Sequence, residues 1–267
     1  MNEWLVVVIL GIVEGITEFL PVSSTGHLLL VEQWLPIRES DTFLVVIQSG
    51  AALAVLLVFQ QRLRQLLATW RESASRDYLA RLAGAFVITA AGGLVLKHFN
   101  VKLPETATPV AVATLVGGVL FLLVERWLRG QTDRRTDGQT VGWAIAIAVG
   151  LAQLVAAVFP GTSRSGATIL IALAMGLTRP VAIEFSFLLG VPTLIAAGGL
   201  KLVSALRHPG SEVLHLDLLV LGTLVSALTA FASVRWLLRF VQSHTFEGFG
   251  WYRIALGAAV LLMVFMR

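Results

Sequence analysis

Two glutamates lie four residues apart in an otherwise apolar stretch near the N-terminus. Glu14 and Glu18 belong to the segment EGITEFLPVSSTGH, residues 14–27. On a helix this spacing places both carboxylates on one face, where like charges repel unless a cation lies between them. A hard divalent cation with oxygen ligands answers this repulsion, so the spacing predicts a metal site. The alternative is that one or both glutamates lie at a membrane interface or stay protonated in a hydrogen bond.

The same segment continues with a helix-breaking proline and a polar run that can open a new helix. The run consists of Ser23, Ser24, Thr25 and Gly26. Exposed amides at a helix N-terminus bind anions, and a glycine lets a ligand approach the backbone closely. An ordinary N-cap is the alternative. His27 follows, and it is predicted to act as a general acid or base toward a hydroxyl or water, with a packing or capping histidine as the alternative.

A second polar cluster, PGTSRSG at residues 160–166, places an arginine between hydroxyl groups. Its candidate ligand-binding residues are Thr162, Ser163, Arg164, Ser165 and Gly166. A guanidinium binds phosphate oxygens in a bidentate manner, and hydroxyls add donors. The alternative is an arginine that extends to the membrane interface. Together the two clusters suit a phosphate or diphosphate, attacked by a serine or a water with help from a metal.

The composition indicates which solvent surrounds these clusters. Of the 267 residues 57% are hydrophobic and only 13% are charged, with a mean hydropathy of +0.83. Long apolar runs recur along the chain, which is typical of a polytopic α-helical membrane protein. We expect no secretory signal peptide, because no basic region precedes the first apolar run. The chain has no cysteine, and this excludes disulfides and cysteine-based metal sites.

The basic residues predict an orientation in the membrane. The net charge of +4 is attributed to cytoplasmic loops and not to a nucleic acid partner. Six crossings are expected, at 42–59, 79–97, 109–128, 182–203, 216–236 and 250–266. The arginines that flank or occupy the expected inner connections are Arg62, Arg64, Arg71, Arg76, Arg81, Arg126, Arg129, Arg134, Arg135, Arg235, Arg239 and Arg253. Both chain ends then lie on the outer side.

Two apolar segments, 4–30 and 141–177, are left over by this count, and they resemble each other. At one constant offset Glu14 meets Gln153 and Ser24 meets Ser163. We therefore expect one domain over residues 1–267, built as an inverted repeat of about 1–128 and 141–267. Broken helices at membrane depth are tolerated where they line a wet cavity or are buried in protein, so both segments are predicted to be re-entrant helical hairpins.

EGITEFLPVSSTGH and PGTSRSGAT resemble the two signature motifs of the bacterial undecaprenyl-diphosphate phosphatase family of the bacitracin-resistance type. FLVVIQSGAALAVL, RPVAIEFSFLLGVP and YRIALGA are similar to further family segments. The resemblance implies hydrolysis of undecaprenyl diphosphate to the monophosphate and inorganic phosphate, which recycles the lipid carrier of cell-wall synthesis. It also implies a bacterial plasma membrane location, a divalent cation (Mg²⁺ or Ca²⁺), and a site that opens to the outer side.

The resemblance further implies roles for individual residues. Glu14 and Glu18 would bind the metal, Ser24 would be the nucleophile, His27 would activate it, and Arg164 would hold the diphosphate. The supporting candidates are Gln48, Ser163, Ser165, Glu184 and Ser186. Water bound to the metal is the alternative nucleophile.

A lipid-phosphate flippase or transporter is the main alternative function, because inverted repeats with broken helices at the midplane are a transporter architecture. An ion channel or a purely structural protein explains neither polar cluster. The expected partners are a polyprenyl diphosphate substrate and membrane lipids. The oligomeric state is left open, with a homodimer as one option.

Overall fold

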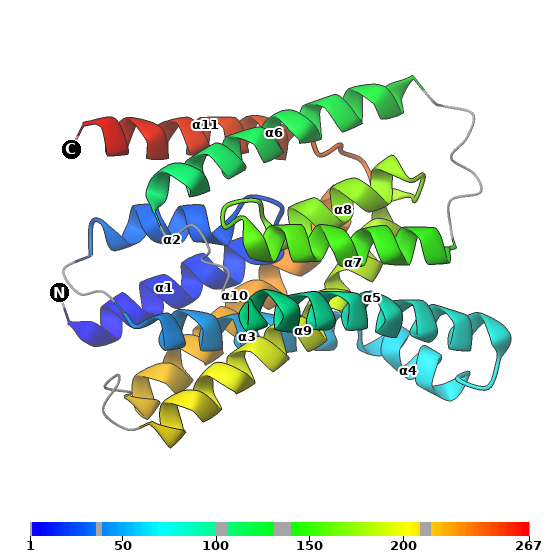
Figure 1. Cartoon of the computed structure of the whole chain (residues 1–267), viewed down its shortest axis with the longest axis horizontal. Coiled ribbons are helices and arrows are strands. Elements are labelled where there is room, and N and C mark those ends of the chain that lie inside the picture. The colour runs from blue at the N-terminus through cyan, green and yellow to red at the C-terminus, as the bar shows by residue number, and fades with distance from the viewer. Residues whose placement is uncertain (1, 36–38, 100–105, 131–139, 209–214, 267) are drawn as a thin grey trace.

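The computed structural model describes residues 2–35, 39–99, 106–130, 140–208 and 215–266, and these residues form helices and connecting turns (Figure 1). In the described part of the chain the helices are α1 Glu3–Thr17, α2 Ser24–Glu32, α3 Asp41–Val58, α4 Gln60–Ala68, α5 Ser73–His98, α6 Ala107–Arg129, α7 Trp143–Val158, α8 Arg164–Ala174, α9 Arg179–Arg207, α10 Leu216–Phe240 and α11 Glu247–Phe265.

Six of these helices are long and apolar enough to cross a membrane: α3, α5, α6, α9, α10 and α11. Their number and positions confirm the expected crossings and the all-helical membrane class. One difference concerns α5, which begins at Ser73 and not near residue 79. Arg76 and Arg81 therefore lie on the first turns of this helix, and residues 60–68 form α4 instead of a loop.

The two leftover apolar segments each form a pair of short helices. α1 and α2 are joined across residues 18–23, and α7 and α8 across residues 159–163. α1 has 15 residues and α7 has 16, which correspond to about 23 Å of helix and are too short to cross the apolar core of a bilayer. The breaks thus occur where Pro21 and Pro160 predict them, and a re-entrant course through the bilayer stays a prediction.

The helix contacts interlock the two halves of the chain. α1 packs against α10 of the C-terminal half, and α7 packs against α5 of the N-terminal half. α3 packs against α9, and α6 against α11, so that equivalent helices face each other (Figure 1). Packing of each short helix against the opposite half of the chain is the contact pattern that an interdigitated repeat would produce. The division into repeats of about 1–128 and 141–267 stays a prediction.

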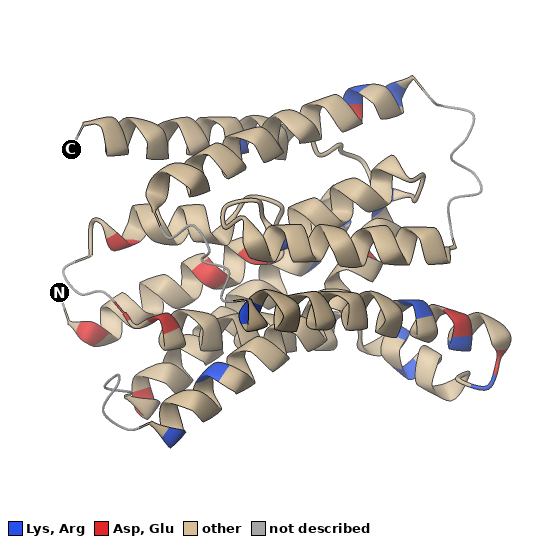
Figure 2. Ribbon diagram, viewed as in Figure 1, with Lys and Arg blue, Asp and Glu red and all other residues tan. Residues whose placement is uncertain are grey.

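Basic residues gather at one end of the molecule. Figure 2 shows Lys and Arg on α4, on the first part of α5 and on the last part of α6, at the end away from both termini. Two of the arginines expected in this group, Arg134 and Arg135, lie outside the described residues.

Candidate active site

The two turns between the short helices are built alike. Ser23 precedes α2 with a φ of 74°, and Ser163 precedes α8 with a φ of 67°. In each case the serine hydroxyl accepts a hydrogen bond from a glycine amide three residues later, Gly26 at 3.3 Å and Gly166 at 3.2 Å. Both serines therefore act as N-caps, and their left-handed backbone turns the chain sharply into the next helix.

This geometry corrects the constant offset that was expected between the two segments. Ser23 is the structural counterpart of Ser163, and Ser24 is the counterpart of Arg164. The second turn holds one more residue between its proline and its capping serine, with Gly161 at a φ of 94°. The extra residue shifts the second segment by one position, so the two halves present different side chains at the same place.

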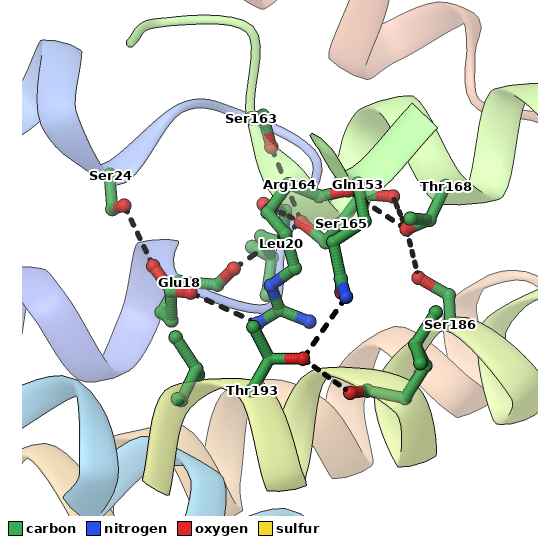
Figure 3. A network of polar contacts seen from close by, with 12 residues as sticks. Glu18, Leu20, Ser24, Gln153, Ser163, Arg164, Ser165, Thr168, Ser186 and Thr193 are labelled. Atoms are coloured by element: carbon green, nitrogen blue, oxygen red, sulfur yellow. Dashed lines mark hydrogen bonds and ion pairs between the residues drawn. The ribbon is translucent and has the colours of Figure 1, made fainter. Parts of the chain in front are cut away.

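An ion pair joins the two turns. Arg164 Nη2 lies 3.0 Å from Glu18 Oε1, and the side chains are only 12% and 7% exposed (Figure 3). The hydroxyl of Ser24 donates a hydrogen bond of 2.8 Å to Glu18 Oε2. Figure 3 shows Glu18 between Ser24 and Arg164. The predicted nucleophile, one predicted metal ligand and the predicted phosphate-binding arginine thus lie in one contact network.

Several buried polar atoms of this network have no partner in the described part of the chain. Arg164 keeps Nε and Nη1 without a hydrogen bond, and no donor reaches the carboxylate oxygens of Glu14, whose carboxyl group faces that of Glu18. Glu14 is fully buried and lies one helical turn before Glu18, whose amide bonds the Glu14 carbonyl at 2.9 Å. Buried donors and acceptors of this kind need partners, so the site is suited to an anion at Arg164 and a cation at Glu14.

A cavity of about 220 Å³ lies at the meeting point of the turns. Its lining includes six of the predicted site residues: Glu18, Ser24, Thr25, Gln48, Ser163 and Arg164. Gln153, the α7 counterpart of Glu14, also lines it. The Gln153 amide donates to Thr89 at 3.1 Å and to Thr193 at 3.0 Å, while its Oε1 has no partner in the described residues. Sequence reasoning missed Thr89 and Thr193; the only signal was a single threonine in each apolar helix.

Other predicted residues build the turns and do not line the cavity. The buried Ser165 hydroxyl contacts the carbonyls of Glu18 at 3.3 Å and Leu20 at 3.2 Å, which ties the second turn to the first. The buried capping residues Ser23, Gly26 and Gly166 and the partly exposed Thr162 belong to the same framework. These residues position the turns that carry Ser24 and Arg164.

His27 lies away from the polar cavity. Its Nδ1 is 2.8 Å from the Ser23 carbonyl, and its Nε2 is 2.6 Å from the hydroxyl of Tyr252. It lines a separate apolar cavity of about 390 Å³ together with Trp236 and Phe249. Because a carbonyl only accepts, Nδ1 carries the proton and Nε2 accepts from Tyr252. The structure therefore does not bring the His27 ring to the Ser24 hydroxyl.

Arg253 is the main residue that the sequence interpretation misplaced. It was counted among the basic residues that flank the connection before the last helix, yet it is fully buried in α11. Its guanidinium donates to carbonyls of both turns, Pro21 at 3.4 Å and Thr162 at 2.9 Å, and to Thr114 of α6 at 3.2 Å. Gly117 leaves room for it, since a Cβ there would lie 2.1 Å from Nη2. The signal was an arginine inside the apolar segment YRIALGA.

Two of the supporting candidates lie elsewhere. Glu184 pairs with Arg62 at 2.9 Å and lines a different cavity, so it is not part of the site at the turns. Ser186 is buried and contacts Thr168 of α8 (Figure 3). It thus fixes α8 against α9 and does not line the cavity itself.

Comparisons with known proteins match nearly the whole chain. Residues 7–259 match the family described as bacitracin resistance protein BacA. An undecaprenyl-diphosphatase of Rhizobium etli is 49% identical over 256 residues, which cover 96% of this chain and 95% of that protein. One from Rhizobium johnstonii is 48% identical with the same coverage. One from Xanthomonas oryzae pv. oryzae is 46% identical over 263 residues, which cover 98% of this chain and 97% of that protein.

Proposed function

The chain belongs to the bacitracin resistance protein BacA family, and we propose that it hydrolyses undecaprenyl diphosphate in the cavity between the two turns. The products are undecaprenyl phosphate and inorganic phosphate. One observation carries the location: Glu18 contacts both Arg164, which has unsatisfied donors, and the carboxyl group of Glu14, whose oxygens lack a donor in the described residues. Arg164 would hold oxygens of the diphosphate, and Glu14 and Glu18 would hold a divalent cation that supplies positive charge.

Arg164 is placed to hold the phosphate. Its Nη2 is occupied by Glu18, while its Nε and Nη1 have no partner in the described residues. Nε and Nη1 point away from each other across the guanidinium plane, so a bidentate contact with one phosphoryl group pairs either of them with the second N–H of Nη2. The hydroxyls of Ser163 and Thr25 line the same cavity and supply further donors. The arginine therefore stabilises the negative charge that the transferring phosphoryl group carries.

The two glutamates fit a divalent cation, Mg²⁺ or Ca²⁺. In the described part of the chain no donor reaches either oxygen of the fully buried Glu14, and its carboxyl group faces that of Glu18. Two buried carboxylates side by side are costly unless a cation or a proton compensates them. No group of three or more His, Cys, Asp or Glu side chains suited to a metal occurs among the described residues. Glu14 and Glu18 would therefore share the cation with substrate oxygens and water, as is usual for Mg²⁺. When bound, the cation neutralises diphosphate charge and polarises a phosphoryl oxygen.

The nucleophile is the Ser24 hydroxyl or a water in its place. Attack on the terminal phosphorus forms a new P–O bond, breaks the bond to the bridging oxygen, and releases undecaprenyl phosphate. Glu18 accepts the hydrogen bond of Ser24 at 2.8 Å, so the geometry favours Glu18 as the proton acceptor. On the serine route water then cleaves the phosphoserine to release inorganic phosphate. His27 would have to leave both of its partners to take this proton.

The membrane location follows from the helices and from the family. The chain is a multi-pass membrane protein, and its relatives are bacterial. We place it in the plasma membrane with the arginine-rich end toward the cytoplasm, because basic residues are retained on that side. The site would then act on the outer side, where the lipid carrier is recycled after cell-wall synthesis.

The test is phosphate release from undecaprenyl diphosphate by the purified protein in detergent. We would measure it with Mg²⁺, with Ca²⁺, with a chelator, and in the Glu18→Ala and Arg164→Ala variants. Release that requires the cation and is lost in both folded variants supports the proposed site. Arg64→Ala is a suitable control, because Arg64 is exposed on α4 and lines neither the polar nor the apolar cavity. If folded wild-type protein releases no phosphate but moves the lipid across a liposome membrane, the chain is a transporter.

A further inference from the structure

We propose that Phe19 is a positioning residue of the reaction, because its ring holds the Arg164 guanidinium in the orientation in which it binds phosphate. The inference rests on the proposed function and deepens it. Phe19 belongs to the first turn and is fully buried. Arg164 Cζ lies over its ring, 4.8 Å from the ring centroid. A guanidinium at this distance is attracted by the negative face of an aromatic ring.

A contact through the face of the guanidinium uses none of its hydrogen-bond donors. All N–H groups of an arginine lie in the guanidinium plane and point outward from its edge. One of them is given to Glu18, with Nη2 3.0 Å from Oε1, while Nε and Nη1 have no partner in the described residues. A polar side chain in the place of Phe19 would hold the arginine by occupying another donor. The aromatic ring therefore orients Arg164 and leaves its donors for a phosphate.

The hydrogen bond to Glu18 does not fix the guanidinium by itself. It is the one hydrogen bond that the Arg164 side chain makes within the described part of the chain, and it joins a single nitrogen to a single oxygen. A guanidinium held at one point can rotate about that point, whereas a second contact through its face removes this freedom. The two side chains are only 12% and 7% exposed, and cation–π attraction is stronger between desolvated partners.

The ring of Phe19 is itself fixed by α9. The fully buried Phe187 meets it edge to face, with the ring centroids 4.9 Å apart and an angle of 64° between the planes. Gly190 lies three residues later, on the same face of the helix. It leaves room for the guanidinium, since a Cβ there would lie 1.7 Å from Arg164 Nη1. One face of α9 thus holds the ring and admits the arginine that the ring orients.

The alternative is that Phe19 only fills space in the apolar core. A Phe19→Leu variant would lose activity under either interpretation, because it removes the ring and also leaves a cavity. Fluorine atoms on the ring separate the two roles. They draw electrons from the face of the ring and weaken its attraction for a cation, while the ring keeps nearly the same shape.

The experiment measures kcat and KM for phosphate release from undecaprenyl diphosphate by the purified full chain with Mg²⁺. Phe19 is replaced by phenylalanine with one, two or three ring fluorines through suppression of an amber codon. Phe185 is the matched control, because it is a fully buried phenylalanine of α9 whose ring packs against Tyr78. Calorimetric titration with methylenediphosphonate, a diphosphate analogue that cannot be hydrolysed, measures binding without turnover.

We expect kcat/KM to fall with each fluorine at position 19, by about tenfold in all, which corresponds to about 1.4 kcal/mol. The dissociation constant of methylenediphosphonate should rise in the same order. The Phe185 series should stay within about twofold in both measurements, because among the described residues no cation lies over that ring.

Equal values along the position 19 series, or an equal fall in both series, would overturn the proposal and leave Phe19 as a packing residue. Activity that rises with fluorination would overturn it as well. The proposed function fails separately. If the wild type binds methylenediphosphonate with this graded dependence on position 19 but releases no phosphate, the hydrolytic reaction is wrong and the positioning of Arg164 by Phe19 stands.

Discussion

Arg164 reaches from the second turn to Glu18 of the first turn, with Nη2 3.0 Å from Oε1, while its Nε and Nη1 make no hydrogen bond in the described part of the chain. Phe19 lies beneath the guanidinium, 4.8 Å from Cζ to the ring centroid. The arginine is therefore oriented before any substrate arrives. Because the two partners come from different halves of the chain, the candidate active site is complete only when both halves are folded together.

Arg164→Lys tests the need for a planar donor. A lysine ammonium can keep the charge opposite Glu18 but cannot also present two parallel donors to a phosphoryl group. We expect phosphate release to fall about 100-fold or more. Arg129→Lys is the matched control, since Arg129 pairs with Glu247 at an exposed position. Equal activity of Arg164→Lys and the wild type would contradict the bidentate role.

Gly190→Ala tests the position of the arginine without changing a charged residue. A Cβ on Gly190 of α9 would lie 1.7 Å from Arg164 Nη1, so the guanidinium would have to move. We expect a loss of about tenfold or more in phosphate release, since small displacements of positioning groups have large effects on rate. Gly199→Ala on the same helix is the control, because nothing lies within 4 Å of its Cβ position. Unchanged activity in both variants would show that the Arg164 position is not needed.

Local patterns in the sequence were sufficient to predict the crossings and both turns. Apolar length identified the six long helices, and Pro21 and Pro160 marked the breaks between the short ones. Polar residue types at the turns identified Glu18, Ser24 and Arg164, which the structure brings together. Each of these signals is contained within a short window of sequence.

Features that depend on long-range packing were not predictable in the same way. Arg253 looks like a basic residue near a loop, and only the approach of α6 and both turns shows that it binds carbonyl groups. His27 lies next to the polar run, yet the direction of its ring depends on Tyr252, which is 225 positions away. The constant offset expected between the two repeated segments was wrong, because a one-residue insertion in the second turn cannot be recognised in a sequence of small residues.

Glu14→Gln tests the metal site. The amide has the same shape but lacks the charge that a divalent cation needs from a ligand. Gln153, its counterpart in α7, shows that a glutamine fits such a position in this fold. We expect the Mg²⁺ concentration for half-maximal phosphate release to rise at least about tenfold. The control is Glu72→Gln, an exposed carboxylate. An unchanged Mg²⁺ requirement would favour a protonated Glu14 over a ligand.

The orientation in the membrane can be tested with single cysteines, because the natural chain has none. Ser243 is exposed between α10 and α11. Ser204 is exposed near the C-terminal end of α9, and one expected crossing, α10, separates the two residues. With the arginine-rich end in the cytoplasm, an impermeant maleimide should label Ser204→Cys in intact spheroplasts and Ser243→Cys only after lysis. The reverse pattern would invert the orientation and place the active site on the other side.

Arg253→Met tests whether one buried arginine holds the two turns together. Methionine fills part of the space but leaves the carbonyls of Pro21, Thr162 and Thr114 without their donor. Buried acceptors that lose a charged donor destabilise a protein by about 1–3 kcal/mol each, so we expect a clear fall in the unfolding temperature. The same change should weaken phosphate release, because the turns carry Glu18 and Arg164. Arg235→Met is the control, since Arg235 is exposed on α10 and lies over Phe231. A variant as stable and active as this control would show that the helices alone fix the turns, and that the contacts of Arg253 are dispensable.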